Sequence, residues 1–349
     1  MTKNAARVAS SGSSAPRKGW RRALLLFGTI LFIAVLAEVG LRIYAKITLQ
    51  GRGQTYHPEF GWAPLPNVKK VGFFWGRQEP GWTNSLGWRD RETPLKKPPG
   101  KRRVVALGDS FTFGARLDYG ERFSEVLERD LKDLEVINLG VNAYGTDQQL
   151  RVLEVEGLHY EADIVVQAVF LGNDLDDIRY EKHFSWPKPH YELEGGELRL
   201  INPKLTWDVW VRNVSYVGEM VFRLSDRFVP SSRHVVASSW KTTDTVPLFL
   251  ALIRRAREVA RDDGVHYLVM LIYPRESYLK EPTEMEQRVR AGLEEASIPT
   301  LDTFSLFSTR AARGENLFAD DGGHWGRLGN ELAASAMAAE FKKRDWLKD

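Results

Sequence analysis

The sequence contains no cysteine among its 349 residues. Disulfide bonds, thiolate metal ligands and cysteine nucleophiles are therefore excluded. It also lacks the glycine-rich motif of phosphate-binding P-loops and the glycine fingerprint of dinucleotide-binding folds. The seven histidines show no spacing typical of a metal site. We therefore predict neither a metal nor a cofactor.

The chain also lacks a large excess of one charge, since it has 49 basic and 46 acidic residues. Nucleic-acid-binding proteins usually carry a strong basic excess on one face, so no nucleic-acid partner is predicted. Hydrophobic residues make up 43% of the chain, which is enough for a sizeable core.

The N-terminus combines a basic tail with a long apolar run. Residues 1–22 hold six basic residues and no acidic one, and we expect this tail to be disordered. The run from Ala23 to Leu41 contains one charge, Glu38, near its end. As a helix it would be about 30 Å long, which matches a bilayer core. We predict a single transmembrane anchor over 23–42, with the tail cytoplasmic and the rest extracytoplasmic (periplasmic in a bacterium).

Two other interpretations of this run are a buried core helix and a cleaved signal peptide. A buried core helix is disfavoured because so long an apolar run behind a basic tail is unusual in a core. A cleaved signal peptide ending at Val35-Leu36-Ala37 has suitable small residues. The apolar run continues beyond that point, which favours an uncleaved signal-anchor. Anchor and signal peptide both place the remaining chain outside the cytoplasm.

Residues 43–100 form a stalk or collar rich in glycine, proline and aromatic residues, without clear periodicity. These rings either pack on the main domain or form a surface that stacks on sugars. Packing is favoured, because aromatic side chains mostly serve as core and interface material. The rings are Phe60, Trp62, Phe73, Phe74, Trp75, Trp82 and Trp88.

Residues 101–349 alternate short apolar runs with segments of helical spacing. Strands are expected near 104–107, 136–141, 164–171, 265–273 and 298–301, and helices near 121–133, 147–159, 246–262, 282–296 and 327–344. This alternation predicts an α/β fold, a three-layer α/β/α sandwich with a mainly parallel sheet. Thr146 and Gln149 predict a capping box at the start of the second helix. Functional sites of such folds lie at the carboxyl ends of the strands.

The alternation is interrupted by an insertion at about 176–245. Within it, Gly195-Gly196 stands between alternating residues and predicts a β-hairpin. The insertion is either a lid or substrate wall over the site or a surface addition, and both interpretations remain open.

The first chemical motif is Gly108-Asp109-Ser110, directly after the first expected strand. A serine hydroxyl becomes a good nucleophile only when a base removes its proton. Taken alone, this motif is an ordinary turn.

Two further turns end the next two strands. The turn Asn138–Gly145 can aim backbone N–H groups at a developing oxyanion, and the amide of Asn173 can donate to the same oxygen. A fourth motif, Asp321-Gly-Gly-His324, precedes the last helix. Its imidazole can accept the serine proton, and its carboxylate can fix the imidazole tautomer. Asp320 is the alternative acid.

The four motifs, in this order, resemble those of the SGNH/GDSL hydrolase family, here as GDSFTFG, NLGVNAYGTDQ, LGND and DDGGHWGRLG. The resemblance covers about residues 101–345 outside the insertion and implies a flavodoxin-like SGNH-hydrolase fold. It implies that Ser110 is the nucleophile and also an oxyanion donor, that Asn173 is a second donor, that His324 is the base and that Asp321 orients it. Residues that complete the motifs are Gly108, Asp109, Gly172, Asp174 and Gly329.

One position departs from the family pattern. The family usually has glycine at the second-motif donor, which aligns with Ala143. Alanine keeps the backbone N–H, but a positive φ there would cost about 1–2 kcal/mol. Gly140 or Gly145 are the alternative donors. The G-x-S-x-G elbow of α/β-hydrolases is absent, which argues against that fold.

Two further groups of polar residues are not interpreted as catalytic or metal-binding. Asp174, Asp176 and Asp177 are interpreted as a solvated loop rim in preference to a cation site. His183 and His190 are interpreted as solvated or hydrogen-bonding residues.

The function expected from the resemblance is that of a membrane-anchored serine esterase. It would remove acyl groups, with O-acetyl favoured, from a cell-envelope carbohydrate or glycolipid. Envelope polysaccharide-assembly proteins are the expected protein partners. Two alternatives stay open: an O-acyltransferase that passes the acyl group to a sugar hydroxyl, and a non-catalytic envelope binding or scaffold protein with the same fold.

Overall fold

The computed structural model describes residues 17–48, 54–68, 73–74, 77–78, 82–183, 186–226, 234–236 and 244–348. The expected disordered tail lies outside these ranges up to residue 16. From Arg17 the chain is helical, so residues 17–22 belong to a helix and not to a tail. This helix, α1 (Arg17–Thr48), also includes the first residues of the expected stalk.

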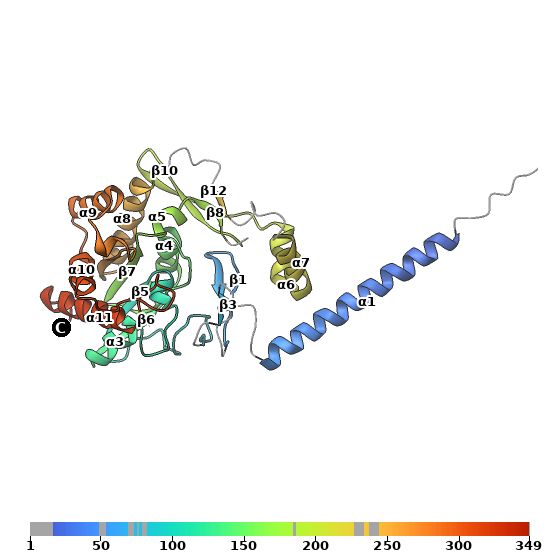
Figure 1. Cartoon of the computed structure of the whole chain (residues 1–349), viewed down its shortest axis with the longest axis horizontal. Helices are drawn as coiled ribbons and strands as arrows, with labels where there is room; N and C mark the ends of the chain where they lie inside the picture. Colours follow the sequence, from blue (N-terminus) through green and yellow to red (C-terminus); the bar gives the residue numbers. More distant parts are fainter. Residues whose placement is uncertain are drawn as a thin grey trace, which may run out of the picture.

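Helix α1 extends away from the rest of the molecule (Figure 1). Its stretch Gly19–Tyr44 is the one helix in the described part of the chain that is long and apolar enough to cross a membrane. Its leucine, isoleucine and phenylalanine side chains are exposed on all sides, as expected for a helix surrounded by lipid.

A five-stranded sheet forms the centre of the main domain. Every neighbouring pair in it is parallel, and the order is β14-β13-β7-β5-β6. The strands are β5 (Arg102–Leu107), β6 (Leu134–Asn138), β7 (Ile164–Phe170), β13 (His266–Ile272) and β14 (Thr300–Asp302). Most side chains of β5, β6, β7 and β13 are aliphatic and buried, as expected for parallel strands covered by helices on both faces, while the edge strand β14 is only partly buried.

Helices cover both faces of the sheet, so the three-layer α/β/α prediction is confirmed (Figure 1). On one face, α3 (Phe123–Asp130) packs against α11 (Arg327–Lys343). On the other, α4 (Thr146–Val155) packs against α8 (Val246–Asp262), and α9 (Glu284–Glu295) packs on α8. A further helix, α10 (Phe304–Ala312), follows β14 and had no sequence prediction.

The start of α4 differs from the prediction by one residue. Its N-cap is Gly145, whose N–H donates to the Gln148 side chain at 3.3 Å. Gln149 instead donates to Asp174 at 3.0 Å, and the Thr146 hydroxyl is buried without a partner in the described structure. The predicted capping box of Thr146 and Gln149 was therefore wrong, because the helix begins one residue earlier and the buried Asp174 accepts the Gln149 amide.

The collar consists of short antiparallel pairs. These are β1 (Gln54–His57) with β2 (Gly61–Pro64) and β3 (Phe73–Phe74) with β4 (Arg77–Gln78). Phe60, Trp62 and Trp88 are buried in the main core, while Trp82 is 39% exposed. These three rings therefore serve packing. Trp75 lies outside the described residues.

The insertion contains the predicted hairpin and two helices. The hairpin joins β10 (His190–Glu194) to β11 (Glu197–Ile201), and Gly195 and Gly196 both have positive φ at its turn, as a two-residue turn demands. A second small sheet holds β8 (Tyr180–His183), β9 (Trp186–Pro187) and β12 (His234–Val236). Helices α6 (Trp207–Val214) and α7 (Tyr216–Asp226) lie beside the end of α1 (Figure 1).

Candidate active site

The serine of the first motif begins a short helix, α2 (Ser110–Phe113), directly after β5. Gly108 has a φ of +159°, and a side chain there would lie 2.1 Å from the Thr112 hydroxyl. Asp109 is fully buried and accepts the Phe111 N–H at 2.9 Å. Burial raises the pKa of Asp109. Glycine and aspartate therefore fix the turn that presents Ser110 at the end of the strand.

Ser110, His324 and Asp321 lie in a continuous hydrogen-bonded chain. The Ser110 Oγ lies 2.8 Å from His324 Nε2, and His324 Nδ1 lies 2.7 Å from Asp321 Oδ2. The first contact is within reach for transfer of the serine proton to the imidazole, and the second lets the carboxylate orient the ring. The structure thus joins the first and fourth motifs, which are more than 200 residues apart in the sequence.

The carboxylate of Asp321 is held in place by backbone donors. Its Oδ1 accepts the N–H groups of Gly323 and His324 at 3.0 and 3.1 Å. Burial would raise the pKa of Asp321, but the hydrogen bonds from the His324 ring and from these N–H groups lower it to about 2. Arg116 also lies 3.3 Å from Oδ2, a contact that no sequence signal indicated. Asp321 is therefore an anion facing the imidazole.

The loop that carries His324 is fastened to the core on both sides. Phe318 and Trp325 form an isolated antiparallel bridge, and Gly326 donates to the Leu317 carbonyl at 2.9 Å. A side chain at Gly329 would lie 2.6 Å from the same carbonyl, which explains why glycine is found there. The Phe111 ring, next to the nucleophile, lies 5.2 Å from the imidazole. These contacts fix the imidazole relative to Ser110.

The second motif contains three candidate oxyanion donors, the backbone N–H groups of Gly140, Ala143 and Gly145. Gly140 donates to the Asn138 side chain and Gly145 to the Gln148 side chain. The Ala143 N–H has no acceptor among the residues described. Ala143 has a φ of 62°, the left-handed conformation that glycine adopts readily. The geometry therefore favours Ala143 over both alternatives as an oxyanion donor.

Ala143→Gly should raise the free energy of unfolding by about 1 kcal/mol, because it removes the left-handed strain of a β-carbon. Urea denaturation of both proteins measures this. The control is Ala339→Gly on the exposed face of α11, which should lower stability by about 1 kcal/mol at an ordinary helical position. If Ala143→Gly lowered the free energy of unfolding as much as Ala339→Gly does, the backbone at Ala143 would not be strained.

The side chain of Asn173 in the third motif is held by a buried carboxylate, that of Asp177. Asn173 Nδ2 donates to Asp177 Oδ2 at 3.0 Å, which fixes the amide plane. Asp174 and Asp177 are 0% and 4% exposed, so the prediction of a solvated rim was wrong for both and fits only Asp176. His183 is also buried, 3.6 Å from Asp177. The start of α5 (Asp174–Asp177) turns these carboxylates inward, which sequence spacing did not reveal.

Burial is the main cause that raises the pKa of Asp177 to about 8. A carboxyl group with a raised folded-state pKa holds a proton that the unfolded chain has lost, so stability falls as pH rises from about 4 to about 8. In Asp177→Asn the free energy of unfolding should fall less steeply with pH over this range, by up to about 1.4 kcal/mol per pH unit. Urea denaturation at several pH values measures the slope, with exposed Asp176→Asn as control. An unchanged slope in Asp177→Asn would contradict the raised pKa.

The collar also contacts the site. The buried guanidinium of Arg89 donates to the carbonyls of Phe113 and Gly114, at the C-terminal end of α2, at 2.7 Å each. Asp90 accepts the N–H of Asn138 at 2.8 Å, at the start of the second motif. Sequence reasoning missed both residues, since a single arginine or aspartate in an irregular segment gives no pattern. The collar therefore helps to fix both the nucleophile turn and the donor turn.

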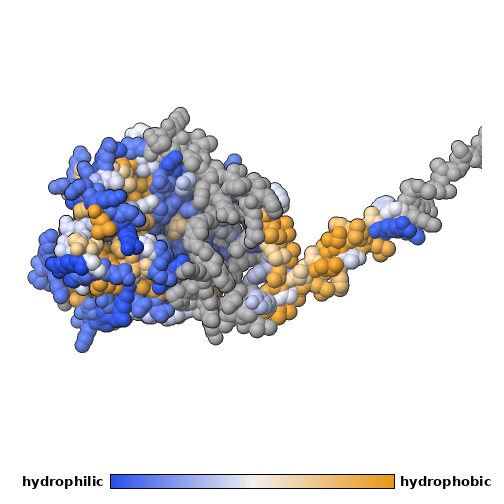
Figure 2. All heavy atoms as spheres, viewed as in Figure 1, coloured by the Kyte–Doolittle hydropathy of each residue, from blue (hydrophilic) through white to orange (hydrophobic). Residues whose placement is uncertain are grey.

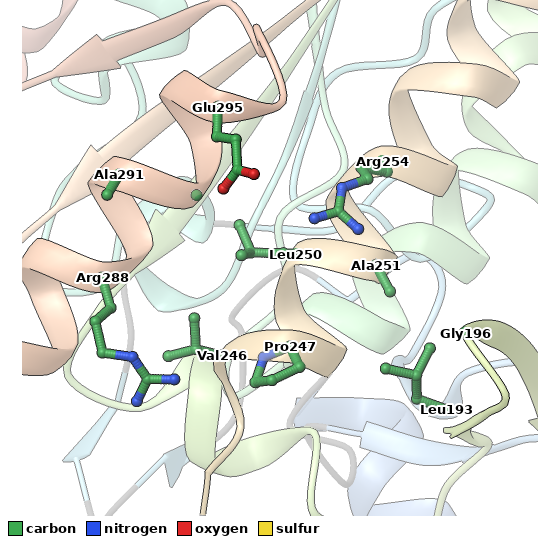
Figure 3. A pocket seen from close by; sticks show the side chains of 11 residues that line it. Leu193, Gly196, Val246, Pro247, Leu250, Ala251, Arg254, Arg288, Ala291 and Glu295 are labelled. Atoms are coloured by element: carbon green, nitrogen blue, oxygen red, sulfur yellow. The ribbon is translucent and has the colours of Figure 1, made fainter.

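A separate pocket of about 420 Å³ lies between α8, α9 and the turn of the β10–β11 hairpin (Figure 3). Leu250 and Val246 face it from α8, with Arg254 and Glu295 at its edge. None of the three residues of the hydrogen-bonded chain lines it.

No protein-family model matches this sequence, and no curated protein is significantly similar to it. Several solved structures are similar in shape. A lipolytic G-D-S-L family protein from Veillonella parvula has a TM-score of 0.43 and 14% identity, covering 69% of this chain and 99% of its own. An acetyl xylan esterase, AlAXEase, has 0.42 and 14%, covering 68% and 98%. A two-domain esterase active on acetylated mannans has 0.43 and 12%, covering 70% and 50%.

Proposed function

We propose that this chain is a serine-dependent carboxylic ester hydrolase of the SGNH/GDSL type. The observation that carries the proposal is the hydrogen-bonded chain Ser110–His324–Asp321, with contacts of 2.8 and 2.7 Å. A serine, an imidazole and a carboxylate in this order form the arrangement that activates a hydroxyl for attack on a carbonyl.

In the first half-reaction, Ser110 Oγ attacks the ester carbonyl carbon while His324 Nε2 takes the hydroxyl proton. The oxyanion that forms accepts hydrogen bonds from the backbone N–H groups of Ser110 and Ala143 and from the Asn173 amide. Collapse of this intermediate expels the alcohol, which takes the proton from His324, and leaves an acyl-serine.

In the second half-reaction, His324 removes a proton from water as the water attacks the acyl-serine. Collapse releases the carboxylic acid and returns the proton to Ser110. Asp321 remains ionised throughout and stabilises the imidazolium, in agreement with its pKa of about 2.

The proposed substrate class is supported by the anchor. With α1 spanning a membrane and its basic N-terminal end in the cytoplasm, the catalytic domain lies outside and meets envelope carbohydrates or glycolipids. Ester groups on such molecules are acyl groups on sugar hydroxyls, and O-acetyl is the substituent that we propose.

The test is fluorophosphonate labelling and acetate release from p-nitrophenyl acetate by the full-length chain in lipid nanodiscs. We expect labelling and turnover in the wild type and neither in Ser110→Ala. The control Ser305→Ala, at an exposed serine on α10, should retain both. A folded wild type that is neither labelled nor active would contradict the proposal.

A further inference from the structure

Helices α6 and α7 of the insertion expose six large apolar side chains. On α6 these are spaced by three and four residues, at Trp207, Trp210 and Val214. On α7 they are Met220, Val221 and Leu224, which also lie on one side of the helix. Their exposed fractions run from 39% to 72%. Both helices thus carry an apolar stripe that the domain does not cover.

The opposite side of α6 is fastened to the domain. Val209 is 1% exposed, and the Asn213 side chain accepts the N–H of Tyr56 in β1 at 3.2 Å. Arg212 is buried, with its guanidinium 4.7 Å from the Phe222 ring and 3.5 Å from Glu219. The helix pair is therefore anchored through one face, and the apolar face points away from the domain.

The helix pair also contacts the membrane-spanning helix directly. Glu38 in α1 accepts the Ser215 hydroxyl at 2.9 Å and the Val217 N–H at 3.0 Å. Arg42 in α1 bonds Glu38 at 2.7 Å and donates to the Val214 carbonyl. The one acidic residue of the apolar stretch is thus bound to the junction between α6 and α7.

This contact fixes the depth of the helix pair. Glu38 lies six residues before Tyr44, where the apolar stretch of α1 ends. At a rise of about 1.5 Å per residue this is about 9 Å along the helix. Amphipathic helices at a membrane surface bury their apolar face about 5–10 Å deep, at the boundary of headgroups and acyl chains. The junction of α6 and α7 is at that level.

We propose that α6 and α7 form a second membrane contact, whose apolar face lies in the outer interface of the bilayer beside α1. The occupant of this face is lipid, because the apolar surface of α1 continues onto the part of the domain where α6 and α7 lie (Figure 2). Two of the six side chains are tryptophans, which are enriched at membrane interfaces. The inference does not depend on the esterase proposal.

The absence of cysteine allows a direct test by single-cysteine labelling of the full-length chain. An environment-sensitive fluorophore is attached at Val221→Cys or Trp210→Cys, in nanodiscs that hold one chain each. A matched control carries it at Glu197→Cys, at the exposed start of β11 beside the hairpin turn. Ile33→Cys, in the middle of α1, identifies nanodiscs in which the anchor is inserted.

We expect blue-shifted emission at positions 221 and 210, with strong quenching by lipids that carry a nitroxide near the headgroup. The probe at position 197 should show neither. Emission and quenching at 221 and 210 that match position 197 would overturn the proposal by placing the pair in water. A blue shift without lipid quenching would also overturn it, since a protein surface would then cover the face.

Discussion

Replacing His324 with alanine is expected to lower kcat for p-nitrophenyl acetate hydrolysis by about 10⁶-fold. The imidazole lies 2.8 Å from the Ser110 hydroxyl, closer than the Asp109 carboxylate at 3.4 Å. Without it the hydroxyl keeps its proton and remains a poor nucleophile. Reactivity of Ser110 with a fluorophosphonate should fall in parallel, because it depends on the same base.

The matched control is His159→Ala, which removes an exposed histidine at a distance in sequence from all four motifs. Its kcat should equal that of the wild type. Thermal unfolding of both variants establishes that His324→Ala is folded, as expected for a side chain that is 28% exposed. A folded His324→Ala protein that keeps more than a hundredth of wild-type kcat would exclude the imidazole as the base.

Asp321→Asn is expected to lower kcat by about 10⁴-fold. The introduced carboxamide can still accept the two backbone N–H groups with its oxygen, so the loop should keep its shape. The amide nitrogen would then face His324 Nδ1 and donate to it. This forces the imidazole proton onto Nε2, which faces Ser110, and the ring can no longer accept the serine proton.

The neighbouring Asp320 provides the control, since it is the other carboxylate that sequence reasoning weighed for this role. Asp320→Asn should change kcat less than threefold. Because the pKa of Asp321 is about 2, its carboxylate is ionised at any pH above about 4, and the difference between the two variants should persist over that range. A larger loss in Asp320→Asn than in Asp321→Asn would reverse the assignment.

The strands and the main helices of the domain were predictable because they carry strong periodic signals. Strand β7 was expected at 164–171 and runs from Ile164 to Phe170, and α8 was expected at 246–262 and has those bounds. The resemblance to the SGNH/GDSL motifs implied that Ser110 and His324 meet, and the structure places them 2.8 Å apart. The family usually has glycine where this chain has Ala143, which raised the question of a positive φ at that position. Ala143 does have a positive φ in the structure.

The surroundings of the site were not predictable. Asp174 and Asp177 gave the sequence signal of a solvated turn, and only the inward path of α5 shows that they are buried. Arg89 lies in a segment without periodicity, yet three backbone carbonyls accept its guanidinium. Such contacts depend on which irregular segments pack together, and no local pattern encodes that choice.

The separation of Ser110 from His324 has a consequence for the time at which the proposed esterase would acquire activity. The nucleophile follows the first strand of the central sheet, while the base lies in the loop before the last helix, whose Asn330 accepts the Phe123 N–H at 3.0 Å. During synthesis the ribosome releases the serine long before the imidazole. A nascent or cut chain that lacks His324 holds Ser110 without this base, so ester cleavage by the proposed esterase would report that the loop carrying His324 has been made and folded.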